Sequence, residues 1–344
     1  MKQGLQALEI GETAQELLAA AGARWNVLAA VRGAIYISNP DRDLLWITDR
    51  PDALHPRAIL IPGMPRHVPQ CGDRLGGSDG LLSCQTFCMV WHQAETWTAR
   101  EASNQDQLGI EFPDRVIDAI RQATNPEQDL VVIGQNEVAA EGGGQPAARE
   151  SASNAMARDL ARSTGTLSRV KVGRDVLRML RAASHIVGLG QGLTPAGDDI
   201  LGGYLYALRA AGKAHGMTFG IDWEGVIAWV QDLAQHTNVI SHCLLLDHAR
   251  GVACAPLAAL MRAALEGARG AQLVQLASDV SGIGASSGRG LLAGVTAACE
   301  VLRTLRGGPL SRSTGLEGNA SGHSRRSGIA SVCRHQAEGC CGER

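Results

Sequence analysis

The hydrophobic pattern of the chain changes from strand-like to helix-like near residue 150. Before that point, short apolar runs rich in β-branched and aromatic residues alternate with turn signals such as Asn39-Pro40-Asp41. Helical runs are mostly absent between them, which favours a small barrel or sandwich over alternating strand–helix units. The runs that predict strands are 33–40, 43–49, 58–61, 81–91 and 129–134, and helices are predicted from Thr13 to Ala21 and over 114–123.

Beyond residue 154, apolar residues recur every three or four positions, as on one face of an α-helix. We therefore expect an α+β fold, in which a β-rich N-terminal domain over 1–138 precedes an all-α helical bundle domain over 154–306. Residues 139–153 are small, polar and rich in glycine, which predicts a linker or exposed loop. Residues 307–344 hold few large apolar side chains, which predicts a disordered tail. The helical stretches are 176–187, 200–212, 226–251, 256–268 and 291–305.

Charge and composition narrow the classes of partner. The net charge is −2 and the pI is about 6.6, so the chain lacks the basic footprint of a protein that binds nucleic acid or an anionic membrane. No apolar run reaches the roughly 18–20 residues of a membrane span, and the first residues lack the apolar core of a signal peptide. We expect a cytoplasmic protein with neither a nucleic acid nor a membrane as partner.

The stretch GLGQGLTPAGDDILGG, residues 188–203, combines a glycine-rich turn with two adjacent carboxylates. It is not the dinucleotide-binding fingerprint, because Leu193 stands where a glycine is needed and the stretch follows a helix. It is not a phosphate-binding Walker loop either, because no Lys-Ser or Lys-Thr pair follows Gly197. Both common nucleotide-binding motifs are therefore excluded.

Two interpretations of this stretch remain open. Asp198 or Asp199 is suited to cap the helix that follows, because a carboxylate satisfies free N–H groups and complements the positive end of the helix dipole. A second carboxylate beside the first is repelled unless a cation, an amide donor or a proton compensates. The backbone N–H groups of the glycine turn suit an anion. The alternative to a structural turn is therefore a site for a ligand of mixed polarity, such as Mg²⁺ with phosphate or a carboxylate bearing an amide.

A second glycine-rich turn opens the helical stretch near residue 290. Residues 284–294 overlay 192–203 if one residue is dropped, and Gly197 then matches Gly288 while Gly203 matches Gly294. Two such helix openings in one bundle are expected to face a shared pocket. Gly202 and Gly203 lower the helix propensity, which a close helix crossing or an approaching ligand would explain.

Thr237 and Ser241 share one helical face between the two turns, where they either line the pocket or bond carbonyls one turn back. No catalytic residue is assigned, and Mg²⁺ held by the aspartate pair stays an alternative. The candidate ligand-binding residues are Gly190, Gly192, Thr194, Gly197, Asp198, Asp199, Thr237, Ser241, Ser286, Ser287 and Gly288.

Three motifs together carry a family resemblance: GLGxGLTPAGDDxLxG at 188–203, TNxISxxxLxxxAxG at 237–251 and GxSSGxxLLAG at 284–294. They resemble a bacterial family of formerly unknown function that includes the third subunit of oxamate carbamoyltransferase, from allantoin breakdown. The resemblance implies transfer of a carbamoyl group from carbamoyl phosphate to oxamate, giving oxalurate and phosphate, together with other subunits. The chain departs from the family's third motif at Ala285, where the family carries His, and at Gly290, where it carries Asp.

The leading hypothesis is a subunit of an oxamate carbamoyltransferase-like complex in ureide or purine-nitrogen catabolism, which binds a small anionic amide or carboxylate at the glycine-rich loop. The first alternative is a non-catalytic subunit that binds a small carboxylate or serves assembly, and the two departures favour it slightly. The weaker alternative is a metal-dependent hydrolase that uses the aspartate pair, against which the lack of a clear histidine ligand counts.

Overall fold

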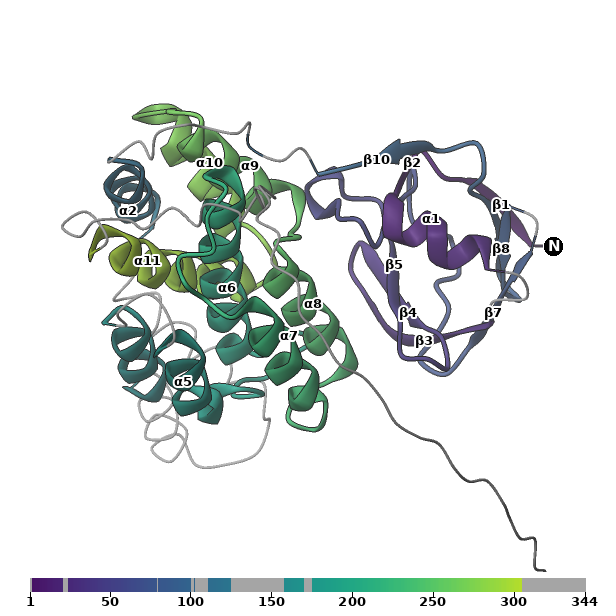
Figure 1. Ribbon diagram of the computed structural model, residues 1–344. Coiled ribbons are helices and arrows are strands. Elements are labelled where there is room, and N and C mark those ends of the chain that lie inside the picture. The colour runs from purple at the N-terminus through teal and green to yellow at the C-terminus, as the bar shows by residue number, and fades with distance from the viewer. Residues whose placement is uncertain are drawn as a thin grey trace, which may run out of the picture. The chain divides into compact units, whose positions relative to one another are not determined.

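The structure is a computed structural model that describes residues 2–20, 24–78, 80–99, 102, 111–124, 158–169 and 175–304. The expected strand at 129–134, the expected linker at 139–153 and the expected tail at 307–344 lie outside the described residues. A ten-stranded sheet built from residues 3–97 precedes a helical region within residues 112–304 (Figure 1). The predicted α+β class is therefore confirmed.

The N-terminal segment joins both ends of the sheet, whose strand order is β1-β9-β8-β7-β3-β4-β5-β6-β2-β10. At one end β1 pairs in parallel with β9, and at the other β2 pairs with β6 and β10. Because only Ala7 and Leu8 separate β1 from β2, the sheet curls on itself, and we call it the barrel. Its strands are β1 (Gln3–Gln6), β2 (Glu9–Gly11), β3 (Arg24–Val31), β4 (Ala34–Ser38), β5 (Leu44–Thr48), β6 (Ala58–Leu60), β7 (Arg74–Ser78), β8 (Leu81–Ser83), β9 (Phe87–Val90) and β10 (Glu95–Trp97).

Strands β4 and β5 are buried on both faces, which explains why β5 reads as the continuous apolar run LLWIT. One face places the cross-strand pairs Ile35–Ile47 and Ile37–Leu45 in the barrel core. The opposite face pairs Tyr36 with Trp46, and Trp46 joins a separate cluster with Ile240 and Cys243 of a helix. The outer face of this hairpin is therefore where the barrel meets the helical region.

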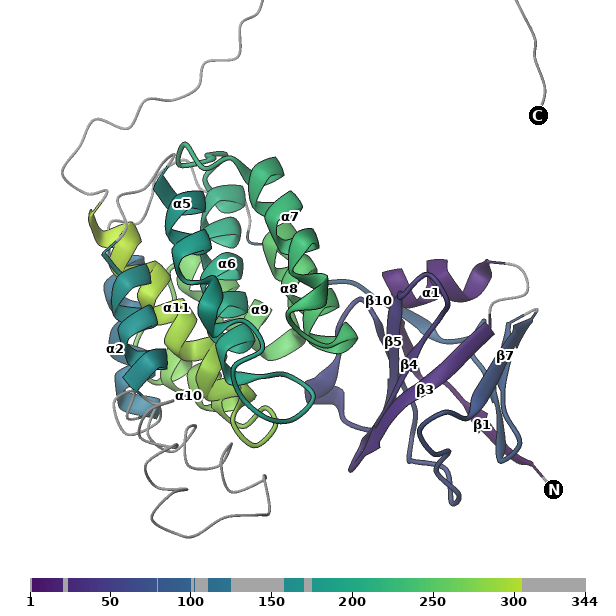
Figure 2. The ribbon, with the colours of Figure 1, turned by 90° about the horizontal axis from the view of Figure 1, so that it is seen from below.

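Two long helices, α6 (Ala196–Ala214) and α11 (Ser287–Thr304), form the centre of the helical region. Figures 1 and 2 show them between α2 (Phe112–Ala123) on one side and α7 and α8 on the other. Helix α2 lies in the part that the sequence assigned to the β-rich domain, but its apolar face packs into the helical core. The remaining helices are α1 (Glu12–Ala19), which covers the barrel, α5 (Asp175–Ala182), α7 (Trp223–Asp232), α8 (Val239–Arg250), α9 (Ala255–Leu265) and α10 (Ala271–Ser281).

Among the described residues, the stretch Val239–Leu265 is long and apolar enough to cross a membrane by length and composition alone. The structure divides it into α8 and α9, separated by a turn at Gly251, whose φ is 82°. Both helices contribute buried side chains to the helical core. The stretch is thus built as two core helices.

Candidate functional site

The two glycine-rich turns lead into helices that cross at very short range. A Cβ added at Gly203 would lie 2.0 Å from the carbonyl oxygen of Leu291, and one added at Gly294 would lie 2.0 Å from that of Ile200. Only glycine permits so close an approach of two backbones. The overlay of residues 284–294 on 192–203 matched Gly203 with Gly294. In the structure, each of these glycines lies against the backbone of the other's helix, at one crossing of α6 and α11. The expected close helix crossing is therefore confirmed.

A second pair of matched glycines holds each turn against the segment that precedes it. A Cβ at Gly197 would lie 1.8 Å from the carbonyl oxygen of Ile186, and one at Gly288 would lie 1.8 Å from that of Val280. The backbone N–H of Gly197 donates to Leu189 and that of Gly288 donates to Ile283, each at 3.0 Å. These two glycines therefore shape the turns, and neither lines the cavity described next.

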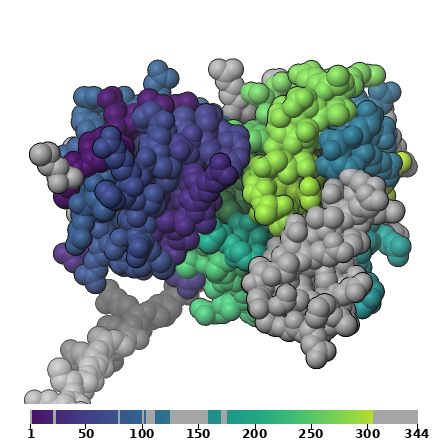
Figure 3. Space-filling view, turned by 180° about the vertical axis from the view of Figure 1, so that it is seen from behind, coloured from purple at the N-terminus to yellow at the C-terminus, as the bar shows by residue number. Residues whose placement is uncertain are grey.

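The turns meet side by side, because the hydroxyl oxygens of Thr194 and Ser287 lie 2.6 Å apart and form a hydrogen bond. The N-termini of α6 and α11 therefore open onto one cavity of about 590 Å³, which lies between the turns, α8 and the outer face of the β4–β5 hairpin. Figure 3 shows the boundary between the barrel and the helical region, where purple strand segments border yellow-green helical segments. The expected shared pocket is present. Five candidate residues line it: Gly192, Thr194, Asp199, Ser286 and Ser287.

Asp198 points away from the cavity and ties the first turn to α8. Its Oδ1 accepts the backbone N–H of Gly188 at 2.8 Å, and its Oδ2 accepts the hydroxyls of Thr237 at 2.5 Å and Ser241 at 2.6 Å. The side chain is buried, with 2% of its surface exposed. Burial raises the pKa of Asp198, and the hydrogen bonds from Ser241, Thr237 and Gly188 oppose that rise. Three candidate ligand residues, Asp198, Thr237 and Ser241, thus bind one another.

Neither aspartate is the N-cap of α6, which is Pro195; both lie in the first helical turn. Asp199 is 7% exposed and lines the cavity. A Cβ at Gly290 would lie only 2.8 Å from the Cβ of Asp199, so a side chain at position 290 would displace this carboxylate. Gly290, where the chain departs from the family's third motif, therefore leaves the space that the Asp199 side chain occupies. Arg289, which precedes Gly290 in α11, does not line the cavity.

The barrel supplies a wall of the cavity that the sequence analysis missed. Tyr36 and Trp46 face it from the β4–β5 hairpin, and Thr48 lines it while its hydroxyl donates to the carbonyl of Gly33 at 2.8 Å. Arg32 and Arg50 line its exposed outer part. One signal was present in the sequence: apolar residues occupy both faces of β5, which indicates that a further layer covers the barrel there.

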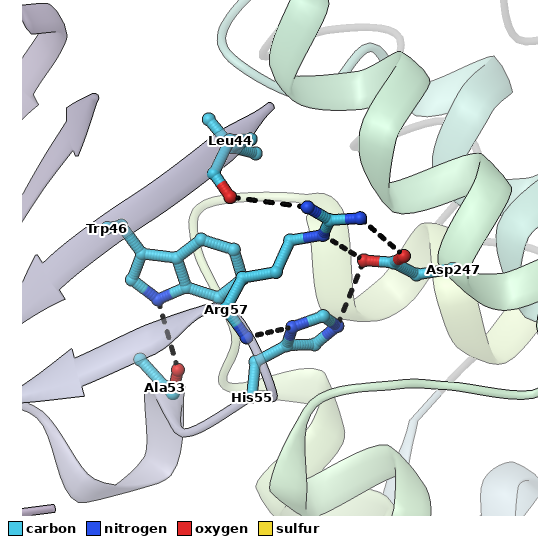
Figure 4. A network of polar contacts seen from close by, with 6 residues as sticks. All are labelled: Leu44, Trp46, Ala53, His55, Arg57 and Asp247. Atoms are coloured by element: carbon cyan, nitrogen blue, oxygen red, sulfur yellow. Dashed lines mark hydrogen bonds and ion pairs between the residues drawn. The ribbon is translucent and has the colours of Figure 1, made fainter. Parts of the chain in front are cut away.

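A buried ion pair holds the barrel against α8 beside this wall (Figure 4). Arg57 donates to Asp247 through Nε at 2.5 Å and Nη2 at 2.9 Å, and through Nη1 to the carbonyl of Leu44 at 3.4 Å. The two partners are 8% and 5% exposed. His55 lies against the pair, where its Nδ1 accepts the backbone N–H of Arg57 at 3.1 Å. This bidentate pair joins residues that are 190 positions apart in the sequence.

Three titratable groups that line the cavity, His55, His248 and Cys254, are held neutral by burial. Burial lowers the pKa of His55 to about 3, with a smaller effect from the charge of Arg57. Burial also lowers the pKa of His248 to about 4, aided by His55 and opposed by Asp247. Burial raises the pKa of the Cys254 thiol to about 11, so this thiol is protonated at neutral pH and is a poor nucleophile. Within the described ranges, no three His, Cys, Asp or Glu side chains gather to hold a metal ion.

Comparison with known proteins concerns the helical wall of the cavity. Residues 186–299 match the family model described as oxamate carbamoyltransferase subunit AllH. The matched residues include both turns, α6 to α10 and most of α11, whereas the barrel wall lies outside the match. No curated protein and no solved structure matches the chain. The match supports the family resemblance expected from the sequence: over residues 186–299, this chain is similar to the oxamate carbamoyltransferase subunit AllH.

Proposed function

We propose that this chain is a subunit of an oxamate carbamoyltransferase-like complex in cytoplasmic ureide or purine-nitrogen catabolism. It binds carbamoyl phosphate or oxamate in the cavity where the two glycine-rich turns meet. The observation that carries the proposal is the hydrogen bond between Thr194 and Ser287, because it brings two helix N-termini and Asp199 to one cavity. The family match supports the subunit class, and the ligand is our inference.

The polarity of the turn side of the cavity fits a ligand with an anionic end and an amide end. Helix N-termini carry partial positive charge, so those of α6 and α11 favour a carboxylate or phosphate. The N–H groups of Gly197 and Gly288 are not among the donors, because each already donates to a carbonyl. One hydroxyl of the Thr194–Ser287 pair is left to donate to a ligand, because the other hydroxyl donates within the pair. Asp199 is an acceptor that suits the N–H groups of an amide. Oxamate and carbamoyl phosphate each combine these two features.

The reaction requires little covalent chemistry from the protein. The oxamate nitrogen attacks the carbamoyl carbon, a C–N bond forms, the bond from that carbon to the phosphate oxygen breaks, and phosphate leaves with the proton lost by nitrogen. Positioning of the two substrates and stabilisation of the developing oxyanion by backbone N–H groups are the contributions we assign to the turns. The protonated thiol of Cys254 agrees with a reaction that uses no protein nucleophile.

The volume of the cavity supports a larger assembly. At about 590 Å³ it falls in the range of sites for drug-sized ligands and far exceeds one oxamate ion. It has room for both substrates, or for one substrate and a segment of another subunit. Members of the matched family are named as subunits, so we propose that other chains complete the catalytic complex.

A second candidate is a non-catalytic subunit that binds a small carboxylate or serves assembly. The neutral histidines and the protonated Cys254 favour it, because the cavity wall lacks an activated nucleophile. A metal-dependent hydrolase has less support. Both oxygens of Asp198 already accept hydrogen bonds, and the part of the chain that the structure describes holds no three-residue metal cluster.

The test is a thermal-shift titration of the full chain with carbamoyl phosphate, oxamate, oxalurate and phosphate, each with and without Mg²⁺. At about a hundred times Kd, binding adds about 2.7 kcal/mol of stability. We expect the stabilisation by oxamate or carbamoyl phosphate to be lost in Asp199→Asn and kept in Asp232→Asn, an exposed control outside the cavity. If a ligand still stabilises Asp199→Asn, it binds elsewhere. If no compound stabilises wild type, the result favours the assembly subunit.

A further inference from the structure

Part of the cavity wall is apolar and aromatic. Four residues that line the cavity also belong to, or pack against, one hydrophobic cluster that is separate from the barrel core: Tyr36, Trp46, Leu193 and Leu244. They come from β4, β5, the first glycine-rich turn and α8, and we call them the aromatic patch. The patch and the polar turn residues are therefore two kinds of surface within one cavity.

The two rings of the patch are held in place by the barrel. Tyr36 and Trp46 are cross-strand partners, with ring centroids 5.8 Å apart and ring planes inclined by 38°. Trp46 Nε1 donates to the carbonyl of Ala53 at 3.3 Å (Figure 4), so the one polar atom of this side chain is already bonded. Because both rings are fixed before a ligand arrives, little conformational entropy is lost when a ligand binds against them.

A third flat ring continues the patch. His55 lines the cavity, and the centroid of its ring lies 5.0 Å from that of Trp46. Burial lowers the pKa of His55 to about 3, so the imidazole is neutral at neutral pH. Uncharged rings at such distances suit offset or edge-to-face contact with a further ring.

Charges of both signs lie near the Tyr36 end of the patch. Burial raises the pKa of Tyr36, the positive charge of Arg50 opposes that rise, and the negative charge of Asp199 adds to it. Arg50 and Asp199 also line the cavity. The Tyr36 side chain is therefore close to both charged groups. A ligand whose amide is bound at Asp199 would reach the patch with a group attached to that amide.

Oxamate alone would leave the patch uncovered. The cavity of about 590 Å³ far exceeds one oxamate ion, and oxamate has no apolar group to place against a ring. Apolar surface that stays in contact with water contributes nothing to affinity, whereas covering it is favourable. Ligand sites typically combine a mostly apolar lining with a few polar groups that fix the orientation, as this cavity does.

We infer that the cavity binds a planar, conjugated anion larger than oxamate, in which a ring attached to the amide lies against Tyr36 and Trp46. The amide lies at Asp199 and the carboxylate near the N-termini of α6 and α11. This inference rests on the proposed function and deepens it by naming the class of ligand, an amide carboxylate that bears an aromatic ring. Both rings of the patch lie outside the family match, so the barrel supplies this selectivity.

The test uses three ligands on one frame, in isothermal titration of the full chain at neutral pH. N-phenyloxamate adds a planar ring to the oxamate nitrogen, and N-cyclohexyloxamate adds an apolar ring that is not planar. We expect wild type to bind N-phenyloxamate at least about tenfold more tightly than oxamate. N-cyclohexyloxamate should bind about threefold or more weakly than N-phenyloxamate, because it cannot stack.

Variants at Tyr36 test where the ring lies. Tyr36→Leu keeps an apolar side chain without a ring, and it should reduce the ratio of N-phenyloxamate to oxamate affinity to about threefold or less. Tyr36→Phe retains the ring and should retain the ratio. Trp97→Leu, which removes a half-buried aromatic residue of the barrel outside the cavity, is the matched control.

Tryptophan fluorescence gives a readout that does not depend on affinity. The chain has six tryptophans, of which Trp46 lines the cavity. Saturating N-phenyloxamate should change the emission of wild type, and the change should disappear in Trp46→Phe although calorimetry still detects binding. An emission change that persists in Trp46→Phe would place the ring away from the patch.

Equal affinities for N-phenyloxamate and oxamate in wild type would overturn the inference without need of any variant. Equal affinities for the phenyl and cyclohexyl compounds would overturn the planar class, and an unchanged ratio in Tyr36→Leu would overturn the place of the ring. If oxamate binds wild type but not Asp199→Asn, and the phenyl ring adds nothing, the proposed function stands and the inference fails. If none of the three compounds binds, both fail.

Discussion

Asp198 and Asp199 are adjacent in α6, but one carboxylate turns toward α8 and the other toward the cavity. The sequence identified both as candidates, because paired carboxylates at a helix start need compensation. It could not assign their roles, since that depends on where Thr237 and Ser241 lie, about forty residues further along. Successive helical residues point about 100° apart. A shift of one position therefore turns a side chain from a structural hydrogen bond with α8 toward the cavity.

The division of roles predicts opposite phenotypes for two alanine variants. Asp198→Ala leaves the backbone N–H of Gly188 and the hydroxyls of Thr237 and Ser241 without their acceptor, so we expect a loss of roughly 2–3 kcal/mol in the free energy of unfolding. Asp199→Ala should cost less stability and abolish stabilisation by oxamate. Urea unfolding with and without oxamate measures both. A larger stability loss in Asp199→Ala than in Asp198→Ala would contradict this assignment.

The buried histidines predict sensitivity to acid. The pKa is about 3 for folded His55 and about 4 for folded His248, below the ordinary 6.5, so the unfolded chain binds more protons between these values. The contribution of the two neutral rings to the free energy of unfolding is present above pH 6.5 and is lost as pH falls from 6.5 toward 4. Each ring contributes a slope of up to about 1.4 kcal/mol per pH unit. Unfolding free energies measured from pH 7.5 to 4.5 should fall less steeply in His248→Gln, and a profile parallel to that of wild type would refute this origin.

At the scale of elements, the crossing of α6 and α11 shapes the site. The sequence indicated it through two matched glycines inside apolar helices, a pattern that costs helix propensity and therefore calls for a packing reason. It did not identify α10 (Ala271–Ser281) or the strands β1, β2, β3, β7 and β10, and it read 81–91 as one strand where the structure has the hairpin β8–β9. The missed strands other than β3 have three to five residues, which carry little pattern, so their pairing depends on contacts distant in sequence.

Alanine substitutions at the crossing should show whether these glycines are needed for close packing of the two helices, because alanine has the higher helix propensity. In Gly203→Ala and Gly294→Ala the new methyl would meet a carbonyl oxygen of the partner helix, so we expect each to lower the free energy of unfolding by about 1–3 kcal/mol or more. Gly165→Ala, in the helical residues 158–167 with open space around it, is the matched control and should raise stability by about 0.5–1 kcal/mol. Equal effects at all three positions, measured by thermal unfolding, would show that close crossing is not the reason for the glycines.

At the scale of the whole molecule, the cavity exists because the barrel meets the helical region. The Arg57–Asp247 pair fastens the two beside the cavity wall. Nothing in the sequence pairs these two residues, because Arg57 lies in no motif, Asp247 stands at an unspecified position of the motif at 237–251, and 190 positions separate them. The helical wall was therefore predictable from its motifs, whereas the barrel wall, with Tyr36, Trp46 and His55, was not.

Removing one partner of this ion pair should lower the free energy of unfolding more than removing both partners. Asp247→Leu leaves the guanidinium of Arg57 buried without its counter-charge, and we expect a loss of about 3–5 kcal/mol. The double variant Arg57→Leu/Asp247→Leu should recover part of that loss, because no unpaired charge remains. Urea unfolding of both variants and of Arg57→Leu completes a double-mutant cycle. Additive losses in that cycle would contradict a coupled pair.

The central claim is that the two turns and the barrel together bind a small anion bearing an amide. The most direct measurement is a crystal structure of the full chain grown with saturating oxamate. We expect oxamate in the cavity, with its amide within hydrogen-bond distance of Asp199 and its carboxylate near the N-termini of α6 and α11. Oxamate bound at another surface, or a cavity that stays without it at saturation, would contradict the account.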